Sequence, residues 1–94
     1  MYKRVLRQMQ DRVRKRQYVM TLHAEEEMAD DGFTIFDVER AILTGKIVER
    51  QEDRHSGEWK YLVLGKVIDG RLITVVAKLS TTNKLVVITV YLEG

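Results

Sequence analysis

The stretch TIFDVERAILTGKIVE, residues 34–49, decides the fold because it contains both a helix start and a change of periodicity. Thr34 and Asp37 have the spacing of a capping box, which marks the first turn of a helix. Apolar residues then recur at helical spacing as far as Gly45, where the helix is predicted to end. After Gly45 the apolar pattern is that of extended strands. The chain is therefore expected to pass from a helical part into a sheet.

Four segments after Gly45 have the β-branched and apolar composition of strands. They are residues 47–51, 59–68, 72–79 and 85–92. The later connections are of hairpin length, and Asp69-Gly70 favours a tight turn because this pair tolerates positive φ angles. Successive hairpins predict an antiparallel sheet. The last strand is so uniformly apolar that we expect it in the middle of that sheet.

Two further helices are predicted before residue 34. In residues 2–16 the apolar side chains recur every three or four positions, which places them on one face, and the arginines take the other face. Thr21 can cap a second helix over residues 22–31, with Gly32 available as its left-handed terminator. Both helices are amphipathic and need an apolar surface to pack against.

The predicted fold class is therefore α+β, with two or three N-terminal helices packed on a three- to four-stranded antiparallel sheet. A chain of 94 residues is enough for one compact core and too short for two ordinary domains. We expect a single domain over residues 1–94. Residues 1–17 would be a basic amphipathic helix and residues 18–94 the helix-and-sheet core.

The composition excludes several classes of site. The sequence has no cysteine, which rules out disulfides, thiolate metal sites and a cysteine nucleophile. No apolar run approaches the length of a membrane span, and the basic N-terminus leads into no signal-peptide core, so a cytoplasmic protein without membrane contact is expected. The sequence contains no glycine-rich phosphate loop or dinucleotide fingerprint, and no cofactor is predicted.

The net charge of +2 conceals a segmented distribution. Residues 1–20 carry seven basic side chains and one acidic side chain, whereas residues 21–45 carry seven acidic side chains and one basic side chain. A basic arm of this kind can bind a polyanion. Pairing of the two segments with each other is the alternative interpretation.

Polar residues interrupt the apolar strands and are candidates for a site. Strand alternation places Thr89 and Tyr91 on one side of the last strand, and Lys60 and Lys78 interrupt two earlier strands. A sheet face carrying lysines and hydroxyls could hold an anionic ligand. The alternative is that Thr89 and Tyr91 are only strand formers and that the lysines extend to solvent.

His23 is the second candidate, in the first turn of the predicted helix at residues 22–31. The positive end of the helix dipole disfavours its imidazolium while the following glutamates favour it, so His23 could serve as an acid or a base. It could equally be a structural histidine that bonds the backbone. A metal site with Glu26 or Glu27 is allowed by spacing, but that helix has no second histidine and we predict no metal.

Several segments together resemble the family called domain of unknown function 4258. They are His23-Ala24-Glu25-Glu26-Glu27-Met28, Gly32-Phe33-Thr34, Asp37-Val38, Ala41-Ile42, Gly45-Lys46-Ile47-Val48-Glu49, Tyr61-Leu62-Val63-Leu64-Gly65 and Ile88-Thr89-Val90-Tyr91. The resemblance covers roughly residues 18–94. That family is similar to the RelE-like and BrnT-like bacterial toxins, which implies a helix-then-sheet fold and a metal-independent ribonuclease encoded beside an antitoxin.

The resemblance also implies roles for particular residues. RNA would be cleaved by its own 2′-hydroxyl, with His23 as general base or acid. Lys60 or Lys78 would stabilise charge on the phosphate, and Thr89 and Tyr91 would orient it. Supporting phosphate contacts are implied for two arginines. These are Arg50 and Arg71.

Two other functions stay open. Glu27 and Asp31 stand where the family commonly carries arginine, which allows a non-catalytic module that binds an antitoxin-like protein through an edge strand or the acidic helix. Binding of nucleic acid by the basic arm without cleavage is the third. A homo-oligomer through the sheet edge or the N-terminal helix is compatible with each of these functions.

Overall fold

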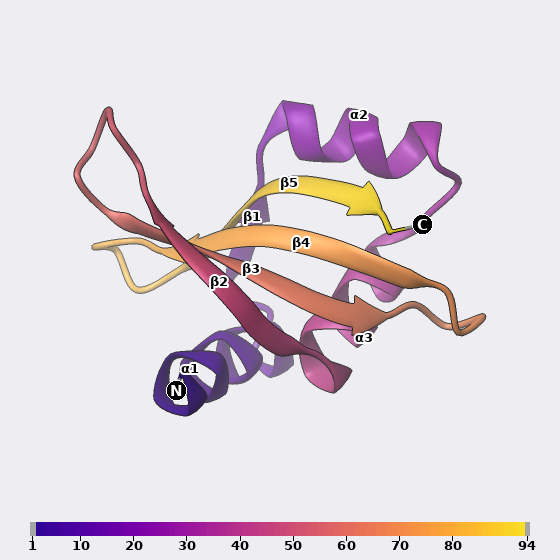
Figure 1. The fold of residues 1–94 in the computed structure, drawn as a ribbon, viewed down its shortest axis with the longest axis horizontal. Coiled ribbons are helices and arrows are strands. Elements are labelled where there is room, and N and C mark those ends of the chain that lie inside the picture. The colour runs from indigo at the N-terminus through magenta and orange to yellow at the C-terminus, as the bar shows by residue number, and fades with distance from the viewer. Residues whose placement is uncertain (1, 94) are drawn as a thin grey trace.

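The computed structural model describes residues 2–93, which form three helices and one five-stranded sheet (Figure 1). In chain order the elements are α1 (Lys3–Arg14), β1 (Tyr18–Met20), α2 (Leu22–Asp30), α3 (Ile35–Thr44), β2 (Lys46–Glu52), β3 (Trp59–Lys66), β4 (Leu72–Leu79) and β5 (Leu85–Leu92). The strand order is β1-β5-β4-β3-β2. β1 runs parallel to β5, and the other neighbouring strands are antiparallel. The α+β class is confirmed.

The expected sheet of three or four antiparallel strands, all following the helices, is wrong because of β1. This strand lies between α1 and α2 and pairs with the start of β5, with Tyr18 opposite Leu85 and Met20 opposite Val87. Three residues are too few to show a period of two, and their partner lies at the other end of the chain. The sheet is therefore mixed, and β5 is an interior strand because β1 covers part of its outer edge.

The helix starts follow the predicted capping chemistry. Thr21 accepts a hydrogen bond from the backbone N–H of Ala24 at the start of α2. Thr34 and Asp37 form a reciprocal capping box at the start of α3, and Asp37 also accepts from the N–H of Ile68 in the β3–β4 turn. These backbone bonds hold the pKa of Asp37 below its usual value. The N-caps and the bounds of β4 and β5 are as predicted.

One face of the sheet forms the core with the helices. α3 packs against β3 and β4, and α1 packs against α3. Gly65 of β3 permits this approach, because a Cβ atom there would lie 1.9 Å from the carbonyl oxygen of Ala41 in α3. Met9 and Val13 of α1 are buried in the same core as Val63 of β3. The basic helix is therefore part of the folded unit.

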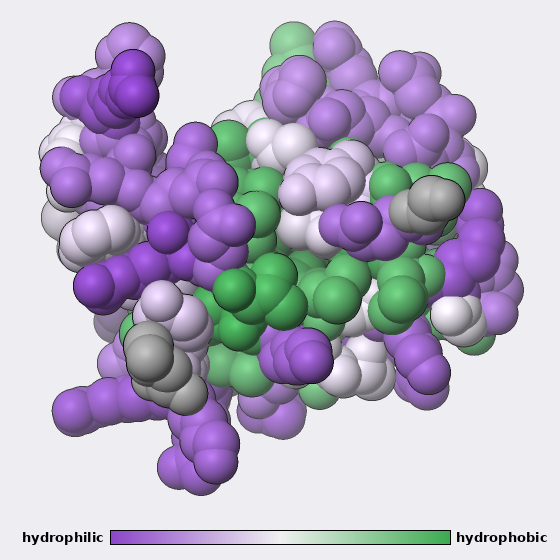
Figure 2. Space-filling view, in the orientation of Figure 1, coloured by the Kyte–Doolittle hydropathy of each residue, from purple (hydrophilic) through white to green (hydrophobic). Residues whose placement is uncertain are grey.

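The other face of the sheet carries no helix from residues 2–93, and we call it the open face. Directly opposite residues on neighbouring strands share a face. The open face contains two such rows: Leu62, Val76 and Thr89, and Leu64, Thr74 and Tyr91. Figure 1 views the sheet from this side, with α3 behind the strands. In the same orientation, Figure 2 shows apolar side chains gathered in the middle of the molecule, between polar margins.

The two edges of the sheet are protected from further strand pairing in different ways. Beyond β1, the edge of β5 is covered by α2, where the Oε1 atom of Glu27 accepts a hydrogen bond of 3.1 Å from the N–H of Val90. β2 is exposed along most of its length and is irregular at Val48, where the pairing with β3 shifts. A bulge and charged side chains discourage further strand pairing at such an edge. No helix among residues 2–93 is long and apolar enough to cross a bilayer.

Candidate functional site

The start of α2 is fixed to the middle of β5, and this contact positions His23. The backbone N–H of Thr21 donates to the carbonyl oxygen of Val87, and its hydroxyl donates to that of Ile88, both at 3.0 Å. His23 follows in the first turn, with 67% of its side chain exposed. The helix start therefore presents an accessible imidazole beside β5.

Glu27 connects this imidazole to the strand. Its Oε1 atom lies 3.2 Å from Nε2 of His23, one helical turn earlier, and also accepts the N–H of Val90. A neutral imidazole that donates through Nε2 keeps Nδ1 free as an acceptor, so the carboxylate defines one tautomer. A carboxylate that orients a histidine in this way is a common feature of general acid-base sites.

Two predicted site residues flank Val90 on the same strand. Thr89 is half-buried and Tyr91 is 37% exposed, and both belong to the open face. Ile88 has no partner in the β4–β5 register, because a bulge lies there, and the alternation resumes at Thr89. His23, Thr89 and Tyr91 are therefore brought to one region, which we call the α2–β5 edge and define by these three residues and Glu27.

The two predicted lysines lie at another part of the open face, where β3 and β4 meet the β2–β3 hairpin. The Nζ atom of Lys78 lies 3.3 Å from Oε1 of Glu58 and 4.0 Å from Oδ2 of Asp53, so two carboxylates compensate its charge. Hydrogen bonding from the N–H of His55 is the largest influence lowering the pKa of Asp53, and Lys78 adds to it. Lys78 is therefore engaged within the protein in this structure.

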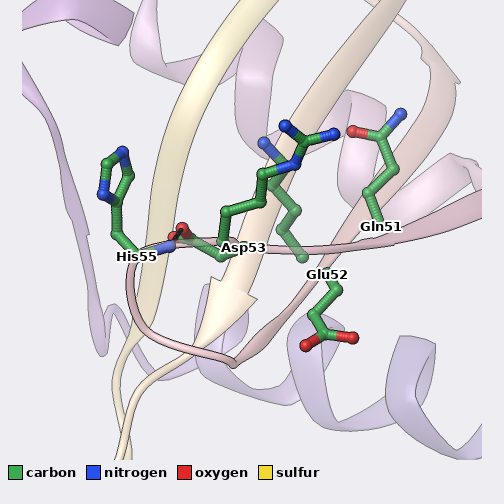
Figure 3. A pocket seen from close by; sticks show the side chains of 6 residues that line it. Gln51, Glu52, Asp53 and His55 are labelled. Atoms are coloured by element: carbon green, nitrogen blue, oxygen red, sulfur yellow. Dashed lines mark hydrogen bonds between the residues drawn. The ribbon is translucent and has the colours of Figure 1, made fainter.

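Lys60 lines an open hollow of about 430 Å³ on the same hairpin. The other lining residues are Gln51, Glu52, Asp53, Arg54 and His55. Figure 3 shows Gln51 and Glu52 pointing to opposite sides of β2 and His55 standing apart at the far end of the loop. The hollow has a mixed charge, and Lys60 lies on β3, which β4 separates from β5, so Lys60 does not join the α2–β5 edge.

The two arginines implied by the family resemblance lie elsewhere. Arg50 is opposite Tyr61 on the helix side of the sheet, and its guanidinium stacks on the ring of Trp59 at 4.1 Å from the centroid. Arg71, in the β3–β4 turn, pairs with Asp69 at 2.8 Å and lies over the ring of Phe33. Neither arginine joins the α2–β5 edge.

Three carboxylates determine what the candidate residues can do, and the sequence had suggested only one of them, Glu27, as a favourable charge or a metal ligand beside His23. Glu27 orients His23, and its spacing of four residues on one helix was the available signal. Asp53 and Glu58 engage Lys78 across the hairpin, and no local spacing reveals this. Within residues 2–93 no group of three or more histidine and acidic side chains is arranged to hold a metal ion.

Comparison with known proteins gives one result. The family model described as domain of unknown function (DUF4258) matches residues 20–92, which include α2, α3 and β2 to β5. No curated protein and no solved structure gives a significant match. The matched region covers most of the chain and contains the whole α2–β5 edge. On this basis the chain belongs to the DUF4258 family.

Proposed function

We propose that the chain is a toxin-like, metal-independent RNA endonuclease whose reaction takes place at the α2–β5 edge. The observation that supports this proposal is the connection from His23 through Glu27 to Val90, which sets an exposed imidazole beside the strand of Thr89 and Tyr91. The proposal includes kinship with the RelE-like and BrnT-like toxins, a cytoplasmic location, and an antitoxin-like protein as partner.

The reaction requires only proton transfers and positioning from the protein. The 2′-hydroxyl oxygen attacks the adjacent phosphorus and loses its proton, while the bond from phosphorus to the 5′-oxygen breaks and that oxygen gains a proton. The products are a 2′,3′-cyclic phosphate and a 5′-hydroxyl end. His23 would accept the first proton or donate the second, and general acid-base groups of this kind contribute roughly 100-fold to 10,000-fold in rate.

Neighbouring residues have supporting roles in this proposal. The hydroxyls of Thr89 and Tyr91 would donate hydrogen bonds to the phosphate and orient it. Lys60, which makes no ion pair with another residue among positions 2–93, would attract the adjoining phosphates. Lys78 would contribute only after leaving Glu58 and Asp53.

The substrate itself gives a direct test of the proposal. Purified protein is incubated in EDTA with an RNA and with the same sequence carrying 2′-O-methyl groups, and the product ends are identified by mass spectrometry. The proposal predicts cyclic phosphate and 5′-hydroxyl ends from RNA and no cleavage of the methylated strand. Cleavage of the methylated strand, or intact RNA after prolonged incubation, would contradict it.

A second candidate function, a non-catalytic module that binds an antitoxin-like protein, is favoured by the apolar open face. Leu62 and Leu64 are half-buried there, and Leu72 is 41% exposed. Apolar surface of this kind often marks a protein interface. The double variant Leu62→Lys, Leu64→Lys should then lose binding to the product of the adjacent gene, whereas Phe36→Lys, at an exposed position of α3 on the other side of the sheet, should not.

A separate measurement, light scattering, distinguishes a homo-oligomer from a hetero-complex. If the chain associates with itself through the β2 edge or α1, light scattering of the chain alone will give a multiple of its 11.0 kDa mass. Binding to the adjacent gene product without any RNA cleavage would support this second candidate over the nuclease.

A further inference from the structure

We propose that a cleft between α1 and the β2–β3 hairpin binds single-stranded nucleic acid by stacking its bases. The cleft, which we call the base-stacking cleft, is defined by Tyr2, Arg50, Trp59 and Tyr61. It lies on the helix side of the sheet, away from the open face and the α2–β5 edge. This inference goes beyond the proposed nuclease and does not depend on it.

Three aromatic rings and one guanidinium meet in this cleft. Arg50 lies over Trp59 at 4.1 Å and near Tyr2 at 5.9 Å from the ring centroids. Tyr2 meets Tyr61 edge-on, with centroids 6.0 Å apart and planes at 70°. The β2–β3 register explains the arrangement, since Arg50 is opposite Tyr61 and Glu52 is opposite Trp59 on one face. The N-terminal end of α1 adds Tyr2 from the other side.

The cleft has room for a ligand. Tyr2, Arg4, Val5, Arg50 and Tyr61 line a hollow of about 280 Å³. A neighbouring hollow of about 320 Å³ shares Val5 and Tyr61 and extends to Trp59. Trp59 is 42% exposed, so part of its ring remains available to a stacking partner.

The charged residues around the cleft indicate an anionic ligand. Lys3, Arg4 and Arg7 are exposed on the N-terminal half of α1, which contains no acidic residue in its first turn. The one carboxylate lining the second hollow, that of Glu58, is engaged by Lys78. Flat ring faces for bases beside cations for phosphates are the combination that single-stranded nucleic acids require. An acidic peptide would use the cations and leave the rings without a partner.

The single tryptophan of the chain provides the readout, because Trp59 is the only such residue in the sequence. The probe is a 2′-O-methyl octauridylate, and octathymidylate is tested in parallel. Neither probe has a free 2′-hydroxyl, so neither can undergo the proposed cleavage. Stacking predicts quenching of Trp59 fluorescence on titration with either strand, and an affinity that falls steeply as salt is raised.

Substitutions in the cleft and on α3 test whether the oligonucleotide binds at the cleft. With a fluorescein-labelled probe, Trp59→Ala should weaken binding by about fivefold or more, as expected for loss of one base stack. Arg50→Gln should also weaken binding and should make its salt dependence shallower, because one cation is lost. Phe36→Ala and Arg40→Gln, which remove an exposed aromatic ring and an exposed cation on α3, should bind as the unaltered protein does. Circular dichroism on each variant identifies any that fail to fold, and the two hairpin variants are tested independently.

The inference fails if the unaltered protein binds neither strand, or if well-folded Trp59→Ala and Arg50→Gln both bind with unchanged affinity. It also fails if octaglutamate quenches Trp59 as strongly as the oligonucleotides do at the same salt, since the cleft would then be a surface for acidic protein segments. Cleavage of RNA plays no part in these readouts. A failure here therefore leaves the proposed nuclease untouched, and the reverse is also true.

Discussion

The α2–β5 edge and the base-stacking cleft differ in chemistry and in how they are built. The first presents one imidazole among carboxylates and is held by side-chain hydrogen bonds to the backbone of β5. The second presents a guanidinium and three rings and is held by stacking between β2, β3 and α1. The group that could transfer a proton, the imidazole, lies at the acidic α2–β5 edge, and the groups that could bind phosphate lie at the basic cleft. In this chain the exposed imidazole and the basic, aromatic cleft therefore lie on different parts of the molecule.

The largest effect is expected from a substitution in the packing of α3 on β3, which belongs to the core beneath both regions. Gly65→Ala would place a Cβ atom 1.9 Å from the carbonyl oxygen of Ala41, so α3 must shift away from β3. Overpacking of this kind costs about 1–3 kcal/mol, and a backbone clash lies at or above the upper end. Urea denaturation should show that loss of stability, with weaker function at both regions. A variant with unchanged stability would mean that α3 does not rest on β3 as described.

The next effect separates the two regions. Glu27→Ala leaves the N–H of Val90 without its acceptor and should lower the free energy of unfolding by about 1–3 kcal/mol. Glu27→Gln keeps an oxygen acceptor and should be nearly as stable as the unaltered protein, but it removes the negative charge beside His23. Both variants should cleave RNA more slowly and bind oligonucleotides normally. A Glu27→Gln protein that cleaves at the unaltered rate would show that Glu27 serves only the strand edge.

The smallest change in stability at neutral pH is expected for Tyr18→Phe in β1, the strand that leads into α2. Burial and the hydrogen bond from Tyr18 to Glu39 raise the pKa of Tyr18 to about 12 from its ordinary value of 10.0. Because folding favours the neutral phenol, its contribution to stability is complete below pH 10.0 and is lost as the pH rises through about 12. Tyr18→Phe should therefore show a shallower loss of stability over this range in urea denaturation. Parallel pH profiles for the two proteins would contradict the assignment.

Local rules predicted most of the fold. The Thr34 and Asp37 capping box, the Thr21 cap and the apolar runs of β4 and β5 lie within a few residues of sequence and reproduce the observed elements. β1 could not be predicted in this way, because its three residues form a strand only through pairing with β5. A short element that depends on a distant partner has no local periodicity to reveal it.

The sheet face on which Thr89 and Tyr91 lie was predictable from the sequence, and the contacts of the other candidate residues were not. Strand alternation correctly assigned Thr89 and Tyr91 to one face. The engagement of Lys78 by Glu58 depends on the β3–β4 register, and the stacking of Arg50 on Trp59 depends on the β2–β3 register. These tertiary contacts separate residues that the sequence grouped into one cationic surface.

The two histidines of the chain allow the most direct test of the central claim, that RNA is cleaved at the α2–β5 edge. The single-turnover rate of RNA cleavage in EDTA is measured for the unaltered protein, for His23→Ala and for His55→Ala, whose exposed loop histidine has no role in the proposed reaction. The account predicts a loss of about 100-fold or more for His23→Ala and an unchanged rate for His55→Ala. Cleavage by His23→Ala at the unaltered rate would contradict it.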